Sequence, residues 1–356
     1  MKLLTVVGAR PQFVKAAVIS RLIKNDPDLE EVLVHTGQHF DENMSKVFFE
    51  NMEISKPDYQ LEVNSLSHGA MTGNMLIKIE EVLIKEKPDF VIVFGDTNST
   101  LAGALAAQKL HIPIAHIEAG LRSFNMNMPE EANRILTDRI STLLFTPTST
   151  AGNNLKNEGF NALTCEIIQS GDIMLDAAMY YAHSSASKAK LPIKLPKRYI
   201  LATLHRAENT DDPERLKAIV SALNDLHKEI ELILPLHPRT KKMLNKYHIN
   251  LDIHTIDPVG YYEMIELLKN CSLVMTDSGG LQKEAYFFEK PCVTLRNETE
   301  WTELVDNGFN ILAQADSNDI KAKAKQMIAK ELDFSIKLYG NGNAGKEILD
   351  AIKSRS

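Results

Sequence analysis

Short runs of apolar, often β-branched residues alternate along the chain with longer stretches of helical periodicity. In the first half of the chain these runs are Leu3–Val7, Glu31–Thr36, Phe90–Phe94, Ile112–Ile117 and Leu143–Thr146. In the second half they are Tyr199–Leu204, Glu231–Leu236, Ile253–Ile256, Leu273–Thr276 and Cys292–Leu295. Runs of this length and composition predict strands that are buried on both faces.

The stretches between the runs predict helices, among them 11–24, 69–87, 214–229 and 262–269. Buried strands that alternate with helices are typical of a parallel sheet in an α/β fold. Two such series predict two doubly wound domains that join near Gly171 and Asp172. Residues 183–197 are rich in Ser, Ala, Lys and Pro, which predicts a mobile surface insertion.

Size and charge narrow the class of protein. The chain has 356 residues, which suits two domains better than one. Apolar residues make up 44% and charged residues 24%, the mix of a globular protein. The net charge of −7 gives no basic footprint, so nucleic acid is not an expected partner. An anionic ligand would therefore be held by local cations and helix N-termini.

Three cysteines, Cys165, Cys271 and Cys292, lie far apart in the sequence. Their odd number and wide spacing predict neither a disulfide framework nor a metal site, and the last two sit beside apolar runs as small buried hydrophobes would. The strand-like run that follows Met1 and Lys2 does not have the pattern of a signal peptide. No apolar run reaches the ~20 residues needed to span a bilayer, so we expect a cytoplasmic protein without a membrane partner.

The stretch from 116 to 134 holds three carboxylates, Glu118, Glu130 and Glu131, and two arginines, Arg122 and Arg134. It begins as the end of an apolar run. Carboxylates that act as acid and base are well placed where a strand ends, with cations nearby to set their pKa values. A solvated loop whose charges pair with one another explains the same composition, and this stretch alone does not separate the two interpretations.

Two other strand ends in the first half carry candidate chemistry. After the first strand, Gly8 precedes a helix start at which Arg10 and Lys15 lie about one turn apart, which suits an anion. An ordinary strand–helix turn with surface cations is the alternative. After the third strand, Asp96 stands between Gly95 and Thr97 and is either a catalytic carboxylate or, more simply, the cap of the following helix.

In the second half, His205 and His237 each end a strand and are each followed closely by an arginine. Such cations could flank phosphates. A further strand leads into Ser278, Gly279 and Gly280 and then a helix, which presents backbone N–H groups at a positive helix end, an arrangement that suits a diphosphate.

Glu284 lies just inside the helix that follows Gly280 and could accept hydrogen bonds from a ribose diol. Neither the glycine-rich dinucleotide fingerprint nor a P-loop is present in the sequence, so we expect neither NAD nor ATP.

Taken together, the motifs resemble the non-hydrolysing UDP-N-acetylglucosamine 2-epimerases over nearly the whole chain. The matching motifs are Gly8–Pro11, Gly95–Thr97, His116–Arg122, Pro129–Arg134, Thr276–Gly280 and the stretch from Tyr339 to Gly342. The resemblance implies the glycosyltransferase-B architecture, with Rossmann-like domains at 1–171 and 172–335 and a C-terminal helix at 336–356 that packs on the first. It also implies a homodimer and inversion at C2 of a UDP-activated N-acetylhexosamine by elimination and re-addition of UDP, without metal or nicotinamide cofactor.

The resemblance also assigns roles to residues. It implies that the catalytic acids are Asp96, Glu118 and Glu130, and that His205, with Arg10 and Lys15, faces charge on the departing diphosphate. It places the other substrate-binding residues at Gln38, His39, Arg122, Arg134, Arg206, His237, Ser278, Gly279, Gly280, Glu284 and Arg296.

Two stretches, His35–Asp41 and Arg122–Met126, together with Trp301, resemble the branch of this family that epimerises UDP-2,3-diacetamido-2,3-dideoxyglucuronate for surface polysaccharides. A uronate needs a donor for its carboxylate, for which Arg122 and Arg206 are candidates. Its additional acetamido group needs an apolar neighbour, which Phe124, Met128 or Trp301 could supply. Alternatively, Trp301 packs under the loop after Arg296.

Two other functions remain open at this point. A glycosyltransferase of the same architecture would also bind a UDP-sugar, but it would need an acceptor groove and usually one base. A non-catalytic sensor of nucleotide sugars would not need an acidic cluster. The three carboxylates of the first domain favour the epimerase over both.

Overall fold

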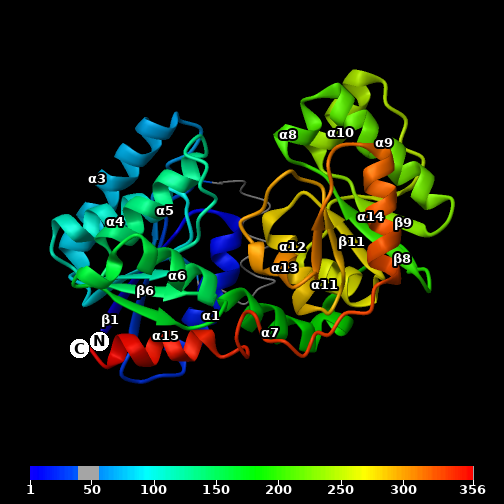
Figure 1. Ribbon diagram of the computed structural model, residues 1–356. Helices are drawn as coiled ribbons and strands as arrows, with labels where there is room; N and C mark the ends of the chain where they lie inside the picture. Colours follow the sequence, from blue (N-terminus) through cyan, green and yellow to red (C-terminus); the bar gives the residue numbers. More distant parts are fainter. Residues whose placement is uncertain (39–55, 356) are drawn as a thin grey trace. The chain divides into compact units, whose positions relative to one another are not determined.

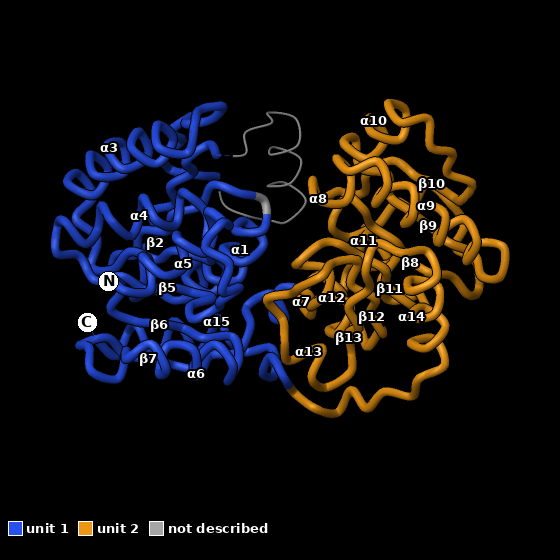
Figure 2. The backbone as a smooth tube through the Cα atoms, turned by 45° about the horizontal axis from the view of Figure 1, so that its top comes forward, with its two compact units in different colours: residues 1–177, 338–356 blue, residues 178–337 orange. Residues whose placement is uncertain are grey.

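A computed structural model describes residues 1–38 and 56–355 of the chain. The predicted substrate-binding residue His39 lies outside the described residues. The chain divides into two compact units (Figure 2): unit 1 comprises residues 1–177 and 338–356, and unit 2 comprises residues 178–337. The two divisions, at 177 and 337, lie a few residues beyond the predicted 171 and 335, and helix α7 (Ile173–Lys188) begins in unit 1 and continues into unit 2.

Unit 1 contains a parallel sheet in the order β3-β2-β1-β4-β5-β6-β7. In chain order its strands are β1 (Lys2–Val7), β2 (Glu30–His35), β3 (Tyr59–Gln60), β4 (Phe90–Phe94), β5 (Ile114–Ile117), β6 (Leu143–Thr146) and β7 (Glu166–Gln169). All described pairings are parallel, so the carboxyl ends of the strands share one edge of the sheet.

Among the described residues, helices lie between β1 and β2 and between the successive strands from β3 to β7 (Figure 1). They are α1 (Arg10–Lys24), α3 (His68–Glu86), α4 (Asn98–Lys109), α5 (Pro129–Ile140), α6 (Ser149–Asn157) and the 3₁₀ turn η1 (Phe160–Ala162). Thr97 caps the start of helix α4, and its hydroxyl accepts a hydrogen bond from the Thr100 N–H. Helix α3 ends at Lys87 in the left-handed conformation, a common helix stop.

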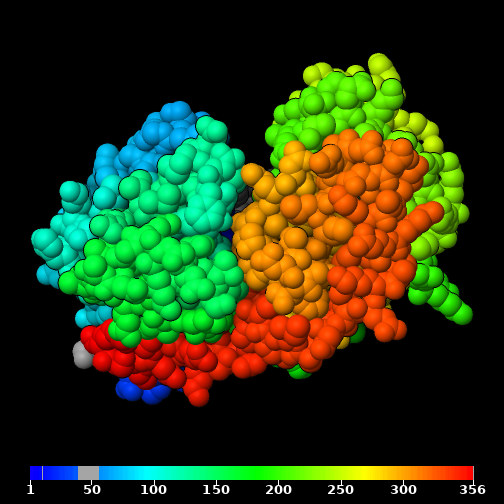
Figure 3. Space-filling view, viewed as in Figure 1, coloured from blue at the N-terminus to red at the C-terminus, as the bar shows by residue number. Residues whose placement is uncertain are grey.

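The last helix, α15 (Ala344–Lys353), packs on unit 1, far from its neighbours in sequence. A Cβ at Gly345 would come within 2.7 Å of a Val18 methyl group of α1, so glycine permits the close approach of the two helices. Asp176 of α7 accepts hydrogen bonds from the first two N–H groups of α15. The C-terminal residues, red in Figure 3, run along the edge of unit 1, where Arg355 pairs with Glu166 of β7.

Unit 2 repeats the architecture with a parallel sheet in the order β10-β9-β8-β11-β12-β13. Its strands are β8 (Tyr199–Thr203), β9 (Glu231–Pro235), β10 (His254–Ile256), β11 (Leu273–Thr276), β12 (Cys292–Thr294) and β13 (Asn310–Leu312). Its helices are α8 (Ala207–Thr210), α9 (Pro213–His227), α10 (Pro238–Tyr247), α11 (Tyr261–Asn270), α12 (Gly279–Phe287), α13 (Thr302–Asp306) and α14 (Ser317–Ala329).

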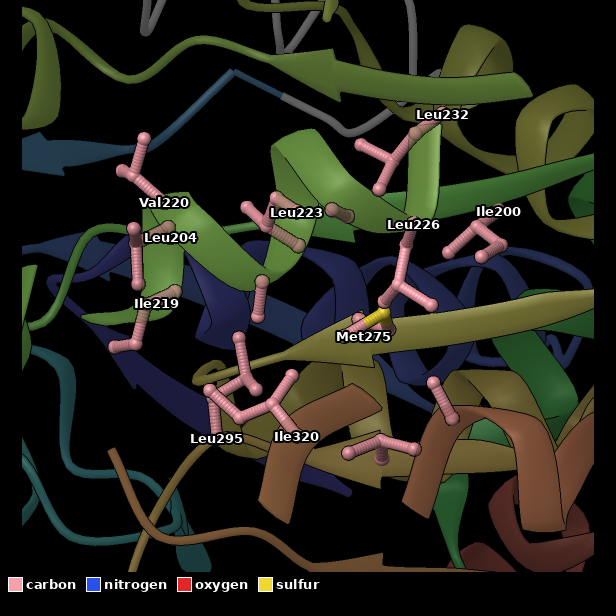
Figure 4. Packing of buried hydrophobic residues seen from close by; sticks show 14 of the residues in the cluster. Ile200, Leu204, Ile219, Val220, Leu223, Leu226, Leu232, Met275, Leu295 and Ile320 are labelled. Atoms are coloured by element: carbon pink, nitrogen blue, oxygen red, sulfur yellow. The ribbon is translucent and has the colours of Figure 1, made fainter. Parts of the chain in front are cut away.

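One apolar core of unit 2 lies between this sheet and the helices α9 and α14, and a second includes residues of α11 and α12 packed on the sheet. Figure 4 shows Ile219, Leu223 and Leu226 of α9 packed with side chains from the strands, such as Met275. Ile320 of α14 belongs to the same buried cluster. Each unit thus has its own apolar core, as expected of a chain of this length.

Residues 183–197 do not form the mobile insertion that their composition predicts. Helix α7 continues to Lys188, and its Ser185 hydroxyl donates to Glu266 of α11. The following loop places Leu191 and Ile193 against the core of unit 2. No helix among the described residues is long and apolar enough to cross a bilayer.

Candidate active site

In unit 1, Glu118 directly follows β5 and forms an ion pair with Lys15 of α1. Each of the two side chains is 9% exposed. The backbone of Glu118 has a φ of +73°, which is uncommon for a residue with a side chain. A Cβ at Gly95 would lie 3.1 Å from Glu118 Oε2, so glycine lets the loop after β4 pass beside this carboxylate.

Asp96 follows Gly95 and is held by Arg134 of α5. Asp96 Oδ2 lies 2.7 Å from Arg134 Nη2 and 3.0 Å from its Nε, and the Asp96 side chain remains 29% exposed. Burial raises the pKa of Asp96; Arg134 opposes this rise and the Glu118 carboxylate adds to it. The simpler interpretation of Asp96 as a helix cap is wrong, because Thr97 caps α4.

Gln12 of α1 joins the loops after β1 and β4 and is buried. Its Oε1 accepts hydrogen bonds from the N–H groups of Gly8 and Ala9 at 2.8 and 3.0 Å. Its Nε2 donates to the Phe94 carbonyl at 2.8 Å and to the hydroxyls of two threonines in the second loop. One side chain therefore sets the spacing between the loop that leads to Arg10 and the loop that carries Asp96.

Arg122 does not fit the substrate-binding role predicted for it. Its side chain is 1% exposed, and its Nη1 lies 2.7 Å from Asp138 Oδ2. Its Nε and Nη2 form a two-pronged pair with Glu158 at 2.7 and 2.8 Å. Asp138 also binds the buried His116 ring at 2.7 Å. These partners use the guanidinium within the fold, where it holds the loop after Glu118.

The two adjacent glutamates of α5, Glu130 and Glu131, have different environments. Glu130 is exposed in the first helical turn, and none of the described residues forms a hydrogen bond or ion pair with its side chain. Glu131 is buried, receives the N–H groups of Ser123 and Phe124, and pairs with Arg134 at 2.6 Å. Sequence reasoning missed this function of Glu131, although its spacing of three residues from Arg134 places both on one helix face.

Two more predicted residues lie at the same edge of the sheet. Gln38, after β2, receives hydrogen bonds from the Ser99 N–H and hydroxyl at 3.1 and 2.8 Å. Arg10 is the first residue of α1, directly after the loop at the end of β1. The structure thus brings the backbone of Arg10 and the side chains of Lys15, Asp96, Glu118 and Arg134 to the carboxyl ends of β1, β4 and β5.

In unit 2, Asp277 after β11 organises the loop after β8. It is fully buried and accepts hydrogen bonds from the N–H groups of His205 and Arg206 at 3.0 and 2.9 Å. His205 Nδ1 lies 3.2 Å from Asp277 Oδ1, and the ring is 38% exposed. No described residue forms a hydrogen bond or ion pair with the guanidinium of Arg206. Asp277 was not among the predicted site residues, although it stands within the motif that pointed to Ser278.

The start of α12 has the features of an anion site. Ser278 is the residue before the helix and Gly280 is exposed in its first turn. A Cβ at Gly279 would lie 2.7 Å from Glu300 Oε1, so only glycine fits there without displacing that carboxylate. Glu300 in turn pairs with the buried Arg296 at 2.9 Å. Farther along the helix, Glu284 is almost completely buried.

Trp301 packs beside this helix and is buried. Its indole Nε1 donates to the Gly279 carbonyl at 2.9 Å, and the Lys283 ammonium lies 3.9 Å from the ring centroid. The packing interpretation of Trp301 therefore agrees with the structure. Because its polar atom and one face already have partners within the protein, it is a poor candidate to receive a sugar substituent.

His237, after β9, is exposed and lies near His205, with 5.4 Å between ring centroids. Its Nδ1 accepts a hydrogen bond from the Arg239 N–H at 3.2 Å at the start of α10. Partial burial lowers the pKa of His237, and the neighbouring His205 lowers it further.

One group of described residues offers the side chains of a metal site: His227, Glu231 and His254, whose ligand atoms lie within 4.8 Å of one another. His227 Nδ1 accepts the Leu232 N–H at 2.9 Å, so in the neutral ring the proton is on Nε2, which points its N–H and not a lone pair toward Glu231. The group also lies at the amino ends of β9 and β10, away from the candidate residues. We assign no metal to it.

Known proteins are similar to this chain over almost its full length. A family model described as UDP-N-acetylglucosamine 2-epimerase matches residues 21–353. The UDP-2,3-diacetamido-2,3-dideoxy-D-glucuronate 2-epimerase of Pseudomonas aeruginosa is 56% identical over 353 residues, covering 98% of this chain and 99% of that protein. The UDP-N-acetylglucosamine 2-epimerase of Escherichia coli K12 is 32% identical over 381 residues, with 99% of each chain covered.

Solved structures of UDP-GlcNAc 2-epimerases are also similar to this chain. The Methanocaldococcus jannaschii UDP-GlcNAc 2-epimerase in complex with UDP-GlcNAc and UDP has a TM-score of 0.89 at 42% identity and covers 99% of this chain and 100% of its own. The Neisseria meningitidis UDP-GlcNAc 2-epimerase bound to UDP-GlcNAc has a TM-score of 0.88 at 31% identity with the same coverage. These matches confirm the predicted α/β fold of two Rossmann-like units.

Proposed function

Because this chain belongs to the UDP-N-acetylglucosamine 2-epimerase family, we propose that it inverts C2 of UDP-2,3-diacetamido-2,3-dideoxy-D-glucuronate, in the biosynthesis of a surface polysaccharide. The observation that carries the choice of substrate is the 56% identity, over almost the full length, to an epimerase for that sugar. Relatives named UDP-N-acetylglucosamine 2-epimerase are 46%, 42% and 32% identical over similar lengths, and one named as a homologue of that enzyme is 49% identical. The family match also favours an isomerase over the glycosyltransferase alternative.

The reaction consists of an elimination and its reversal. A base removes the C2 proton, the C1–O bond to UDP breaks, and a C1=C2 double bond forms. UDP then adds back to C1 while an acid returns a proton to C2 from the opposite face. Atoms and electrons balance without an external oxidant or reductant. The protein must supply a base, an acid on the other side, and fixed positive groups for the departing diphosphate.

The environments of the two carboxylates in unit 1 suit different parts of this reaction. We assign Glu118 as the base, because its ion pair with Lys15 favours the carboxylate form. We assign Asp96 as the acid, because burial raises its pKa above that of an exposed carboxyl. Arg134 positions Asp96 through two nitrogen contacts. Glu130, exposed at the start of α5, is the third carboxylate to which we assign a catalytic role.

Unit 2 supplies the diphosphate and nucleoside contacts in this proposal. His205 and the N–H groups at the start of α12 face the diphosphate, with Asp277 fixing the loop that carries His205. Glu284 holds the ribose. His237 and Arg296 support this region from neighbouring strand ends. The family resemblance implies a further role at the diphosphate for Arg10 and Lys15.

The uronate carboxylate still needs a donor. Arg122 is used within the fold, whereas no described residue bonds to the guanidinium of Arg206. We therefore assign the carboxylate to Arg206. A free, half-buried guanidinium can form a two-pronged pair with a planar carboxylate.

The test is a turnover assay in heavy water with both sugars and no acceptor. We expect deuterium at C2 of the product and at least ~10-fold more efficient turnover of the diacetamido uronate than of UDP-N-acetylglucosamine, a difference of about 1.4 kcal/mol. Efficient turnover of UDP-N-acetylglucosamine alone would overturn the substrate proposal. A protein that labels neither sugar would overturn the epimerase proposal.

We also propose a homodimer, as the family resemblance implies. Ile77 and Ile84 of α3 lie seven residues apart on one helix face, and both are more than half exposed. Light scattering should give a dimer mass, and the double substitution Ile77→Lys with Ile84→Lys should give monomers. Lys85→Ala, at an exposed position of the same helix outside this face, is the matched control. A monomeric unsubstituted protein would contradict the proposal.

A further inference from the structure

The loop between Glu118 and α5 carries an unusually placed aromatic residue. Phe124 is 77% exposed, the largest exposed fraction among the large hydrophobic residues of the described chain. Its backbone has a φ of +58°, a conformation that suits glycine and is rare for a bulky residue. Neither packing nor backbone preference therefore explains a phenylalanine at this position. An unfavourable conformation that persists at a site often has a functional cause.

The loop is held firmly in this conformation. Glu131 Oε1 accepts the Phe124 N–H at 2.9 Å, and Glu131 Oε2 accepts the Ser123 N–H and hydroxyl at 3.0 and 2.9 Å. Glu131 is itself buried. The position of Phe124 is therefore set by a buried carboxylate and does not depend on the contacts of its own ring.

The same carboxylate connects the loop to Asp96. Glu131 Oε2 lies 2.6 Å from Arg134 Nη1, and Arg134 Nη2 lies 2.7 Å from Asp96 Oδ2. Three consecutive polar contacts thus separate the Phe124 backbone from the carboxylate that we assign as the acid. The loop that carries Phe124 is therefore linked through Glu131 and Arg134 to Asp96.

We propose that Phe124 determines specificity by packing against the C3 acetamido group of the substrate, an inference that rests on the proposed function. At C3, the diacetamido uronate carries an acetamido methyl where UDP-N-acetylglucosamine carries a hydroxyl. An aromatic side chain stabilises the methyl group and gains little from the hydroxyl. Of the three residues considered for this role from the sequence, Trp301 is buried and Met128 is only partly exposed, which leaves Phe124.

The experiment compares Phe124→Ala and Phe124→Gly with the unsubstituted enzyme on both sugars. We expect kcat/KM for the diacetamido uronate to fall at least ~10-fold, the scale of a lost apolar contact. For UDP-N-acetylglucosamine, we expect kcat/KM to stay within about 2-fold on the same scale. Where that sugar is not turned over, its inhibition constant replaces kcat/KM. Met126→Ala is the matched control, because Met126 is 67% exposed on the same loop.

Thermal unfolding separates this role from a structural one. Because glycine suits the φ of Phe124, the melting temperature of Phe124→Gly should be unchanged or higher. A lower melting temperature, an equal loss on both sugars, or no loss on either would overturn the proposal. These outcomes differ from failure of the proposed function, in which the unsubstituted enzyme itself would invert neither sugar.

Discussion

At the residue scale, Asp96 and Glu118 are two carboxylates close enough to influence each other and bound to different cations. We predict that Asp96→Asn and Glu118→Gln each reduce kcat at least ~10²-fold, the scale of a lost acid or base. Steady-state kinetics checks this, and circular dichroism should show an unchanged fold. Glu81→Gln, on the exposed face of α3, is the control. Near-normal turnover in both variants would contradict the assigned roles.

Glu31 supports a prediction about pH. Burial raises the pKa of this carboxyl, the Thr5 hydroxyl opposes the rise, and the Asp58 charge adds to it. A raised folded-state pKa in an acid means that stability is fully present below the unfolded pKa and is lost as pH rises through the folded pKa. We therefore predict that Glu31→Gln raises the melting temperature at pH 7.

The predicted gain for Glu31→Gln should disappear near pH 4, where the native side chain is largely protonated. Glu30→Gln, on the exposed neighbouring residue of β2, is the control for the removal of a carboxylate from the same strand. An equal gain for Glu31→Gln at both pH values would show that burial of the charge is not its cause.

The sequence predicted where the site lies better than it predicted which side chains pair with one another there. Apolar runs end where candidate residues begin, so the placement of Asp96, Glu118 and His205 at strand ends could be read from the chain. The use of Arg122 within the fold could not, because its partners, Asp138 of α5 and Glu158 directly after α6, lie 16 and 36 residues further along the chain. The pattern of charges does not show which charges pair.

At the element scale, strands with continuous apolar runs were predicted to within a few residues of their observed bounds. Three strands were missed: β3, β7 and β13. Each is short and lies at an edge of its sheet, where one side of the strand has no neighbour and the demand for apolar residues is weaker. Their existence depends on pairing across the sheet, which a local pattern does not contain.

Helix α15 supports a prediction of its own. Asp176 Oδ1 and Oδ2 accept hydrogen bonds from the Gly345 and Ala344 N–H groups at 2.9 and 3.2 Å. We predict that Asp176→Ala destabilises this helix by about 1 kcal/mol, the usual cost of a lost N-terminal acceptor. Hydrogen exchange of the amides in 344–353 measures the effect. Asp176→Asn keeps one acceptor and should lose less, and equal protection in both variants would contradict the capping role.

At the scale of the whole molecule, the chain passes between the two units twice, near 177 and near 337. The second passage returns it to unit 1, where Ile348 and Ile352 of α15 are completely buried. We predict that removal of residues 338–356 lowers hydrogen-exchange protection in unit 1 while the amides of β8, β9 and β11 keep theirs. Equal losses in both units would show that the two cores unfold as one.

The two buried cysteines of unit 2 can report on the opening of that unit through their reaction with an alkylating reagent. Burial raises the pKa of Cys271 and Cys292 to about 12 each, so at neutral pH almost none of either thiol is present as the reactive thiolate. Cys165, the partly exposed thiol, lies in unit 1. Any alkylation of the two buried thiols therefore requires unit 2 to open. Counting alkylated thiols by mass over time would measure the rate of that opening without an engineered residue.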